Sequence, residues 1–339
     1  MCRPTALLAA LTCLVLGVAG CGTERAPAGA AATASAQPTP AAPTTVPGDA
    51  ASPSGAEGAP GGATTGRPAP ARPYAVGLRT LRWSRGADRP LPTTVFYPAT
   101  GAAGGAPRTG APAASGRFPV LVFSHGLGAA PADYQPLLAR WAAAGFVVAA
   151  PAYPRTSRGT GRIDVADVLN QPADASYVLT RLLALHTEPG DPLRGRMDIT
   201  RVGAAGHSAG GVTTIGLFTV ARDQRLTGGV VLAGSALGVG TAFSGHEVPL
   251  LYVHGARDNV VSYAAGKAAY DATPWPKALL TLPDMGHGEA LRGGGPAFTV
   301  VADTTAEFLR WALYGDARAR DRLPQTAGRG GLATLDDRL

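Results

Sequence analysis

Several residue types are scarce in this sequence, and each shortage excludes a class of protein. Only 3 of the 339 residues are cysteine, at positions 2, 13 and 21. This excludes a disulfide scaffold and, beyond residue 21, any cysteine-ligated metal site. Aromatic residues make up 6% and charged residues 16%. No succession of long apolar runs is present, which excludes a multi-span membrane protein.

Lysine is also scarce, because Lys267 and Lys277 are the only lysines and arginine carries the rest of the positive charge. The formal net charge is +7. The arginines form no continuous run and no basic strip interleaved with aromatic residues. Such strips are typical of nucleic-acid-binding surfaces. We therefore expect no nucleic-acid partner.

The first twenty residues predict an export signal. Arg3 is followed by an apolar run over residues 6–17, which is too short to span a bilayer. Val18-Ala19-Gly20-Cys21 resembles the lipobox of bacterial lipoproteins, in which the cysteine is lipidated and becomes the new N-terminus. We expect Cys21 to carry a lipid that anchors the protein to the outer face of a membrane. The alternative is a plain secretory signal that is cut at Ala19 or later and releases the protein.

Residues 21–70 predict a disordered linker between that anchor and a folded domain. Among residues 22–70, 42 of 49 are Ala, Gly, Pro, Ser or Thr, and none is aromatic, Leu, Ile or Met. Such a segment buries too little apolar surface to offset the entropy of ordering it. A flexible coil of this length has a reach of roughly 40 Å. We therefore expect the linker to hold the folded domain away from the membrane.

Residues 71–315 alternate between strand and helix patterns, which predicts an α/β fold with a mostly parallel central sheet and helices on both faces. Residues 316–339 are charged and contain glycine, and we expect them to form a loose C-terminal tail. The expected strands are residues 78–83, 92–97, 118–123, 146–150, 202–205, 230–233, 250–254 and 278–282, and the expected helices are residues 132–144, 173–184, 209–221, 263–270 and 299–313.

A nucleophile motif lies between an expected strand and an expected helix. Gly206-His207-Ser208-Ala209-Gly210 matches G-x-S-x-G, which in this context forms a sharp turn that exposes the serine. The turn strains the backbone, so the residues two positions before and after the serine must be small. We therefore predict that Ser208 is a catalytic nucleophile.

A serine nucleophile needs a base and an acid that orients the base, and in this architecture they follow in the order serine, acid, histidine. His287 lies in a loop after the last strand and is the expected base, in preference to His254 and His246. Asp258 follows the strand over residues 250–254 and is the expected acid. Asp284 is its rival.

The reaction also needs hydrogen-bond donors for the oxyanion. We expect them to be the backbone N–H of Ala209 and the backbone N–H of Leu127. Leu127 lies in Ser124-His125-Gly126-Leu127-Gly128, directly after a buried strand, where glycine allows a close approach of the backbone to the substrate. We expect His125 to stabilise this loop.

Together these motifs resemble the α/β-hydrolase superfamily. Within it, the chain is similar to the dienelactone hydrolase and platelet-activating-factor acetylhydrolase branch, which is related to bacterial polyester hydrolases. The resemblance covers roughly residues 75–315 and implies an ester-hydrolysing Ser-His-Asp enzyme without a cofactor. The segments that carry it are residues 118–128, residues 145–150, residues 171–179 and residues 206–211.

Substrate contacts are harder to predict. Pockets in such folds open at the carboxyl ends of the strands, and Tyr153 and Trp275 are candidates to line one. Arg155, Arg158 and Arg162 lie on a loop at the same edge and are candidates for binding an anionic group. No zinc-protease, phosphate-loop or dinucleotide motif is present, so we expect neither a metal nor a cofactor.

We therefore expect an extracytoplasmic serine hydrolase that cleaves carboxylic esters through an acyl-enzyme and works as a monomer. Its substrate is a small-molecule, lipid or polymer ester. Two alternatives remain open: an acyltransferase with the same triad, and a non-catalytic binding lipoprotein on a hydrolase scaffold.

Overall fold

The computed structural model describes residues 68–291 and 293–339. The predicted signal peptide, Cys21 and the predicted linker up to residue 67 lie outside the described residues, so those predictions are untested. In the described part of the chain, no helix is long and apolar enough to cross a membrane.

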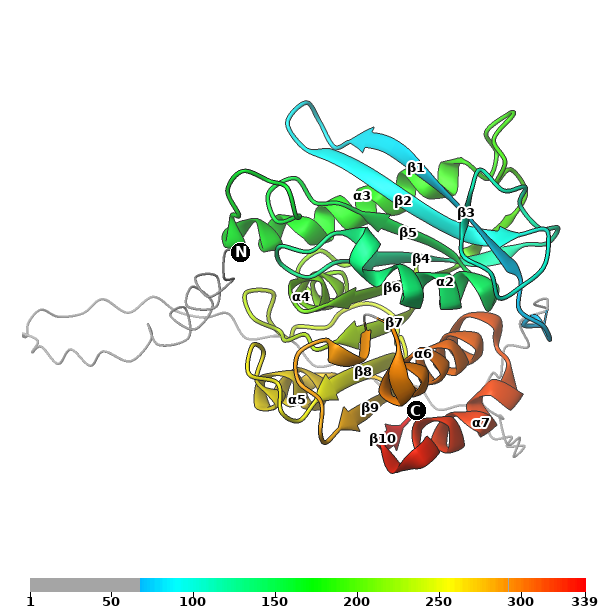
Figure 1. Cartoon of the computed structure of the whole chain (residues 1–339). Helices are drawn as coiled ribbons and strands as arrows, with labels where there is room; N and C mark the ends of the chain where they lie inside the picture. Colours follow the sequence, from blue (N-terminus) through cyan, green and yellow to red (C-terminus); the bar gives the residue numbers. More distant parts are fainter. Residues whose placement is uncertain (1–67, 292) are drawn as a thin grey trace, which may run out of the picture. The chain divides into compact units, whose positions relative to one another are not determined.

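A mixed sheet of ten strands forms the centre of the fold, in the order β10-β9-β8-β7-β6-β4-β5-β2-β1-β3 (Figure 1). The inner strands from β5 to β9 run parallel to one another. The strands are β1 (Ala75–Ser84), β2 (Pro90–Ala99), β3 (Arg108–Thr109), β4 (Phe118–Ser124), β5 (Val147–Pro151), β6 (Met197–His207), β7 (Leu226–Leu232), β8 (Leu250–Gly255), β9 (Lys277–Leu282) and β10 (Thr334–Arg338).

The strand order changes direction at β4, and this determines where a site can form. The chain goes from β4 to β5 on one side and then returns to β6 on the other side of β4. The helices that leave such a switch point diverge, and they leave a crevice at the carboxyl ends of the strands. The carboxyl ends of β4 and β6 flank this position, and they lead into the predicted oxyanion loop and the predicted nucleophile turn.

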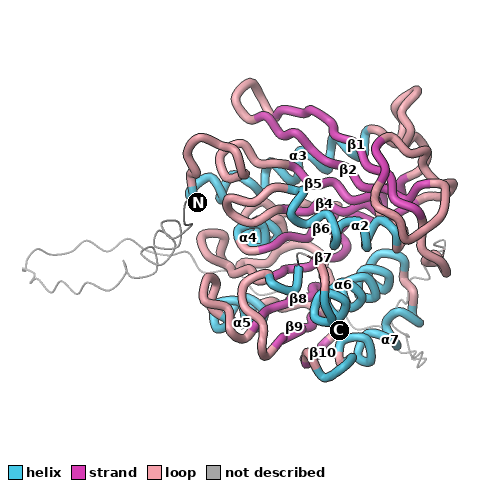
Figure 2. The backbone as a smooth tube through the Cα atoms, in the orientation of Figure 1, coloured by secondary structure: helices cyan, strands magenta, loops and turns pink. Residues whose placement is uncertain are grey.

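Helices cover both faces of the sheet, as predicted (Figure 2). Two apolar clusters fill the two interfaces: α3, α4 and α5 contribute to one cluster, and α2, α6 and α7 to the other. The α-helices are α2 (Gln135–Ala143), α3 (Gln171–Ala184), α4 (Ala209–Gly216), α5 (Tyr263–Ala272), α6 (Gly295–Leu309) and α7 (Ala317–Ala327). Short 3-10 segments are η2 (Pro131–Tyr134), η3 (Val165–Asn170), η4 (Glu289–Leu291) and η6 (Arg329–Gly331), and η5 (Arg310–Tyr314) is a π-helical turn. The α/β-hydrolase fold class is therefore confirmed.

The prediction of a loose tail over residues 316–339 is wrong. Residues 317–327 form α7, which buries Ala319, Leu323 and Ala327. Residues 334–338 form β10, which pairs antiparallel with β9. Ala319, Leu323 and Ala327 recur every four positions, as on one face of a helix, but the surrounding charged and glycine residues obscure this pattern. The folded domain therefore extends to the end of the chain.

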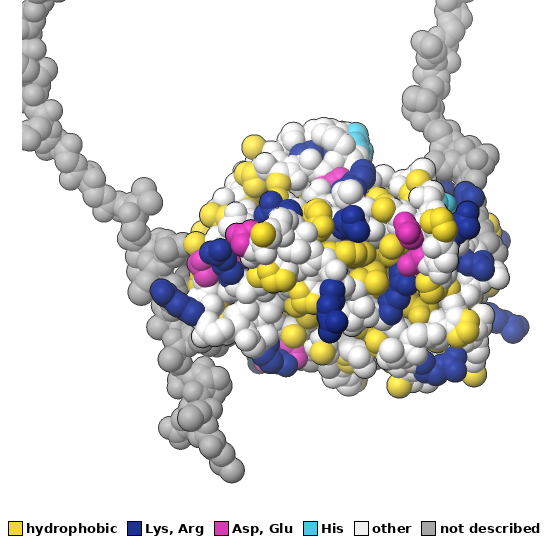
Figure 3. Space-filling view, turned by 90° about the horizontal axis from the view of Figure 1, so that it is seen from above, with side chains coloured by type: hydrophobic (Ala, Val, Ile, Leu, Met, Phe, Trp, Pro, Cys, Tyr) yellow, Lys and Arg dark blue, Asp and Glu magenta, His cyan; other side chains and the backbone are white. Residues whose placement is uncertain are grey.

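Basic side chains are spread over the surface of the described residues. In the face shown in Figure 3, Lys and Arg side chains lie singly among apolar and uncharged groups. Many are also paired, as Arg79 is with Asp191 at 2.7 Å. This distribution differs from the continuous basic stripe that nucleic-acid-binding proteins present.

Candidate active site

Ser208 lies in a tight turn between β6 and α4. Its backbone has φ 58° and ψ −120°, a region that non-glycine residues rarely adopt. The turn is held because the Ser208 N–H donates a 2.9 Å hydrogen bond to the Leu232 carbonyl. Glycine is required on both sides of the serine: a Cβ at Gly206 would lie 2.1 Å from the Gly210 carbonyl oxygen, and a Cβ at Gly210 would lie 2.0 Å from the Ser124 carbonyl oxygen.

Ser208, His287 and Asp258 form one hydrogen-bonded row. His287 Nε2 lies 2.8 Å from Ser208 Oγ, and His287 Nδ1 lies 2.7 Å from Asp258 Oδ2. The carboxylate can only accept from Nδ1–H, which leaves Nε2 able to accept the serine proton. All three predicted residues therefore meet, although they come from three separate loops.

The loop that carries His287 is packed tightly onto the end of β8. The Arg257 N–H donates to the Met285 carbonyl at 3.0 Å. A Cβ at Gly255 would lie 2.3 Å from the same carbonyl oxygen. Glycine at the end of β8 thus lets residues 285–287 come close enough for His287 to reach both Asp258 and Ser208.

Asp258 is buried and fully hydrogen-bonded. Its Oδ1 accepts from the N–H groups of Val260 and Val261 at 2.8 and 2.9 Å. Burial alone would raise the pKa of Asp258, but hydrogen bonds from His254, His287 and Val260 outweigh it and hold that pKa well below its usual range. Asp258 is therefore ionised at neutral pH and can stabilise a positive charge on His287.

The rival residues lie elsewhere. Asp284 pairs with Arg257 at 2.5 Å on the surface, and His246 Nε2 donates to the Leu226 carbonyl at 3.0 Å. His254 is buried beside the acid, with Nε2 3.3 Å from Asp258 Oδ2 and 2.9 Å from the Val261 carbonyl. His254 thus contacts the predicted acid and not the serine, a position that no sequence pattern indicates.

The loop over residues 124–128 lies directly against the nucleophile turn. A Cβ at Gly126 would lie 3.3 Å from Ser208 Cβ. Ala209 is the first residue of α4, where the backbone N–H has no partner within the helix. In turns and loops of the described residues, the Leu127 N–H donates to no backbone carbonyl. Both donors therefore remain available to a ligand at the serine, which is what an oxyanion hole requires.

His125 holds that loop in place, as expected. Its Nδ1 donates to the Gly126 carbonyl at 2.8 Å, and its Nε2 accepts from the Tyr153 N–H at 3.2 Å and lies 2.9 Å from Ser157 Oγ. Burial lowers the pKa of His125 to about 4. The ring is therefore neutral at physiological pH and fixes the loop without adding charge.

The structure contradicts the predicted substrate contacts of Tyr153 and Trp275. Tyr153 is fully buried, and its hydroxyl lies 2.7 Å from Ser124 Oγ. Trp275 lies just before β9, at the amino end of that strand, whereas the site lies at the carboxyl ends of the strands. Its ring packs edge-on against Phe243 and Phe218. Both lie on segments near strand ends, but the direction of a side chain in an irregular segment does not follow from its place in the sequence.

Of the three arginines predicted to bind an anion, one is paired with a carboxylate and two line a surface hollow. Arg158 pairs with Asp133 at 2.6 Å. Arg155 and Arg162 are exposed and line a surface hollow of about 520 Å³ together with Asp164. The hollow adjoins the oxyanion loop, because the Gly128 N–H donates to the Thr156 carbonyl at 2.8 Å. An anion-binding role for Arg155 and Arg162 stays a prediction.

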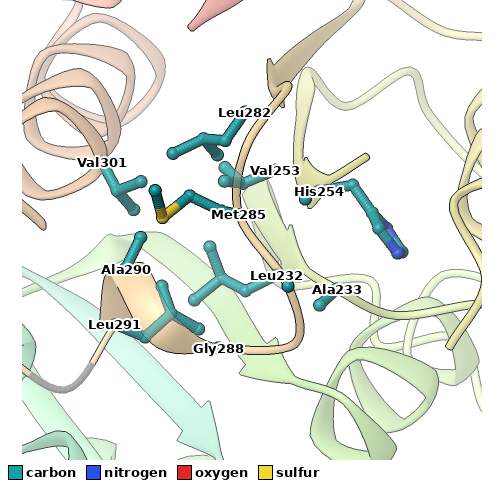
Figure 4. A pocket seen from close by; sticks show the side chains of 12 residues that line it. Leu232, Ala233, Val253, His254, Leu282, Met285, Gly288, Ala290, Leu291 and Val301 are labelled. Carbon is teal, nitrogen blue, oxygen red and sulfur yellow. The ribbon is translucent and has the colours of Figure 1, made fainter. Parts of the chain in front are cut away.

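A small apolar cavity lies beneath the loop that carries His287 (Figure 4). Its volume is about 20 Å³, and Met285, Leu291 and Val301 point into it. This is room for about one water molecule, so the cavity is too small for an acyl chain. Among the described residues, no group of three or more His, Cys, Asp or Glu side chains is placed to hold a metal ion.

Comparison with known proteins adds a family relationship. Residues 106–237 match the sequence model of the Chlorophyllase family, an α/β-hydrolase family whose members are carboxylic ester hydrolases. The matched segment includes Leu127, Ser208 and Ala209, whereas Asp258 and His287 lie beyond it. No curated protein matches the chain. The narrower likeness to dienelactone hydrolases and platelet-activating-factor acetylhydrolases stays a prediction. The chain therefore has an α/β-hydrolase fold, and residues 106–237, less than half of its length, resemble the chlorophyllases, a family of ester hydrolases.

Proposed function

We propose that this protein hydrolyses carboxylic esters with Ser208 as nucleophile, His287 as general base and Asp258 as the orienting acid. The observation that carries the proposal is the row of hydrogen bonds of 2.8 and 2.7 Å from Ser208 through His287 to Asp258. A serine hydroxyl is a weak nucleophile unless a base removes its proton as it attacks. The row supplies that base together with the carboxylate that orients it.

The reaction proceeds in two halves. Ser208 Oγ attacks the ester carbonyl while His287 Nε2 takes its proton, and the tetrahedral oxyanion accepts hydrogen bonds from the N–H groups of Leu127 and Ala209. His287 then donates the proton to the leaving alcohol, and an acyl-enzyme remains on Ser208. Water, deprotonated by His287, attacks the acyl group, and collapse of the second tetrahedral intermediate releases the acid and restores the serine.

Asp258 contributes throughout because it stays ionised. Each half passes through a state in which His287 is an imidazolium, and the carboxylate 2.7 Å away stabilises that charge. It also keeps the proton on Nδ1, so that Nε2 faces the serine. No group outside this chain takes part in the proposed steps except ester and water.

The activity is tested with p-nitrophenyl esters of increasing acyl length. The panel also holds a phospholipid, a polyester and, because of the name of the matched family, chlorophyll. We expect the purified wild-type protein to turn over at least one ester and Ser208→Ala to turn it over several orders of magnitude more slowly. Equal turnover by the two proteins would overturn the proposal. The panel also identifies the substrate class within esters.

We further propose that the mature protein is lipid-anchored at Cys21 on the extracellular face of a membrane. The support is the lipobox-like segment Val18-Ala19-Gly20-Cys21 and the linker composition that follows it. Expression of the full chain and of Cys21→Ala, followed by cell fractionation, tests this. We expect the wild type in the membrane fraction and the variant in the soluble fraction. An unchanged distribution would contradict the anchor.

A further inference from the structure

Tyr134 and His207 are two buried side chains beside the site that the proposed reaction does not use. Tyr134 ends η2 and is 1% exposed, and His207 ends β6 and is 3% exposed. His207 is the neighbour of Ser208 in the sequence, whereas Tyr134 is 73 positions away from His207. Their contacts connect the nucleophile turn to the loop that carries the Leu127 donor.

The hydroxyl of Tyr134 joins two parts of the site. It accepts a 3.0 Å hydrogen bond from the Gly126 N–H, and it lies 2.8 Å from His207 Nδ1. One phenol oxygen therefore links the oxyanion loop to the residue that precedes the nucleophile. A Cβ at Gly126 would lie 3.1 Å from this oxygen and 3.2 Å from His207 Nδ1, so the three groups are in close contact.

This contact restrains the peptide that carries the proposed oxyanion donor. The Gly126 carbonyl and the Leu127 N–H belong to one planar trans peptide and therefore point in opposite directions. His125 Nδ1 holds the carbonyl at 2.8 Å, and Tyr134 holds the Gly126 N–H at 3.0 Å. With both groups of Gly126 held, the peptide that carries the Leu127 N–H has little freedom to turn.

His207 also supports the base. Its ring lies against that of His287, with ring centroids 4.7 Å apart and planes inclined at 39°. A cation is attracted to the face of a neighbouring aromatic ring. In the proposed reaction His287 becomes an imidazolium in each half, and the neighbouring His207 ring then lies against a cation.

We propose that Tyr134 and His207 are positioning residues for ester hydrolysis at Ser208. Tyr134 sets the oxyanion loop against the nucleophile turn, and the His207 ring stabilises the charged form of His287. This inference rests on the proposed function. Both effects act on the transition state rather than on substrate binding, so the two residues control kcat and leave KM unchanged.

The test compares kcat and KM of four variants with those of the wild type, on the best p-nitrophenyl ester. Tyr134→Phe removes one hydroxyl, and we expect kcat to fall about 10- to 100-fold, because the Leu127 donor is misplaced but not lost. His207→Phe keeps an aromatic ring but loses the Nδ1 contact to Tyr134, so we expect its kcat to fall about as far as that of Tyr134→Phe. His207→Leu loses both the contact and the ring, and we expect its kcat to fall a further severalfold. We expect KM to stay within about twofold in all of them.

Tyr97→Phe is the matched control. Tyr97 is also buried, and its hydroxyl donates a 2.8 Å hydrogen bond to the Ala111 carbonyl, far from the site on β2. We expect this variant to lose stability and to keep its kcat. The inference is overturned if Tyr134→Phe and His207→Leu keep wild-type kcat, or if Tyr97→Phe loses as much kcat as Tyr134→Phe does.

Two measurements on the wild type separate this inference from the proposed function. If the wild type neither hydrolyses any ester nor reacts with a fluorophosphonate, the proposed function fails, and the inference fails with it. If the wild type does both and the variants behave like the wild type, only the positioning roles of Tyr134 and His207 fail.

Discussion

Two buried carboxylate clusters in this protein differ in the type of side chain that pairs with the carboxylate. Asp258 is held by an imidazole, with His287 Nδ1 at 2.7 Å. Asp167 is held by a guanidinium, with Arg89 Nη1 at 2.7 Å, and Asp174 contacts the same guanidinium. An imidazole exchanges protons near neutral pH, whereas a guanidinium stays charged. The first cluster can therefore perform acid-base chemistry, and the second can only hold structure.

The second cluster joins segments that are distant in the sequence. Arg89 lies just before β2, Asp167 lies in η3 and Asp174 lies in α3, and Arg85 adds a contact of 2.6 Å to Asp174. Removing one partner from a buried ion pair leaves the other charge without compensation. The cluster therefore ties the β1–β2 hairpin to the chain that runs beside the site.

The sharpest way to separate the clusters is to remove the nucleophile. We expect Ser208→Ala to lower kcat by roughly 10⁴- to 10⁶-fold. Its melting temperature should stay at or above that of the wild type, because the backbone strain at φ 58° does not depend on the hydroxyl. Steady-state kinetics and thermal unfolding check the two parts. Wild-type turnover in this variant would refute the assignment of Ser208.

The next largest effect is expected for Asp258→Asn. The amide cannot stabilise the imidazolium and favours the wrong tautomer of His287, so kcat should fall by about 10³- to 10⁴-fold. Asp167→Asn makes the same chemical change in the arginine cluster and is the matched control. We expect it to keep kcat within about threefold once folded. Equal losses of kcat in the two variants would remove the distinction between the clusters.

Asp174→Ala should show the opposite profile. Its carboxylate is completely buried and contacts both Arg89 and Arg85. We expect the free energy of unfolding to fall by about 3–5 kcal/mol, with kcat of the folded protein nearly unchanged. Denaturant unfolding measures the loss, and Asp336→Ala, at a surface pair with Arg338, should cost less than about 1 kcal/mol. A similar small loss for Asp174→Ala would show that the cluster does not hold the fold.

Acid should weaken the arginine cluster in a predictable direction. Burial alone would raise the pKa of Asp167, but hydrogen bonds from Arg89 and Asn170 outweigh it and bring that pKa below its usual range. A lowered folded-state pKa adds stability that is complete above the unfolded-state value of about 4 and is lost as pH falls through the folded-state value. We expect the melting temperature to fall less steeply below pH 4 in Asp167→Asn than in the wild type. Parallel curves would contradict this.

The smallest effect is expected for His254→Gln. His254 Nε2 lies 3.3 Å from Asp258 Oδ2 and has a better hydrogen bond to the Val261 carbonyl. Loss of one weak contact to the acid should lower kcat by roughly 2- to 10-fold, which corresponds to about 1 kcal/mol. Kinetics on the same ester measure it. A loss as large as that of Asp258→Asn would mean that His254, and not His287, is the main partner of the acid.

The order of strands and helices followed from the sequence because buried parallel strands are continuous apolar runs, such as Phe118–Phe123. The C-terminal region did not follow. In α7 the buried residues are Ala319, Leu323, Thr326 and Ala327, of which only Leu323 is large and apolar, so the helix has a weak sequence pattern, and β10 is a charged edge strand. Its pairing with β9 depends on a contact between segments about 55 positions apart.

The residues of the site also fall into those that the sequence predicted and those that it did not. Ser208 was predictable because the turn dictates its neighbours, and Asp258 and His287 because the order of loops in the fold leaves few candidates. Tyr134 and His207 were not, because their contact depends on the packing of η2 against β6 and leaves no spacing in the sequence. Tyr153 was misassigned because its place at a strand end does not show that its hydroxyl turns inward toward Ser124.

Covalent labelling tests the central assignment most directly. The wild type, Ser208→Ala and His287→Ala are treated with a fluorophosphonate and analysed by intact mass and peptide mapping. We predict one adduct per wild-type molecule, located on Ser208, no adduct on Ser208→Ala and greatly slowed labelling of His287→Ala. A wild-type protein that stays unlabelled, or an adduct on another residue, would contradict the account.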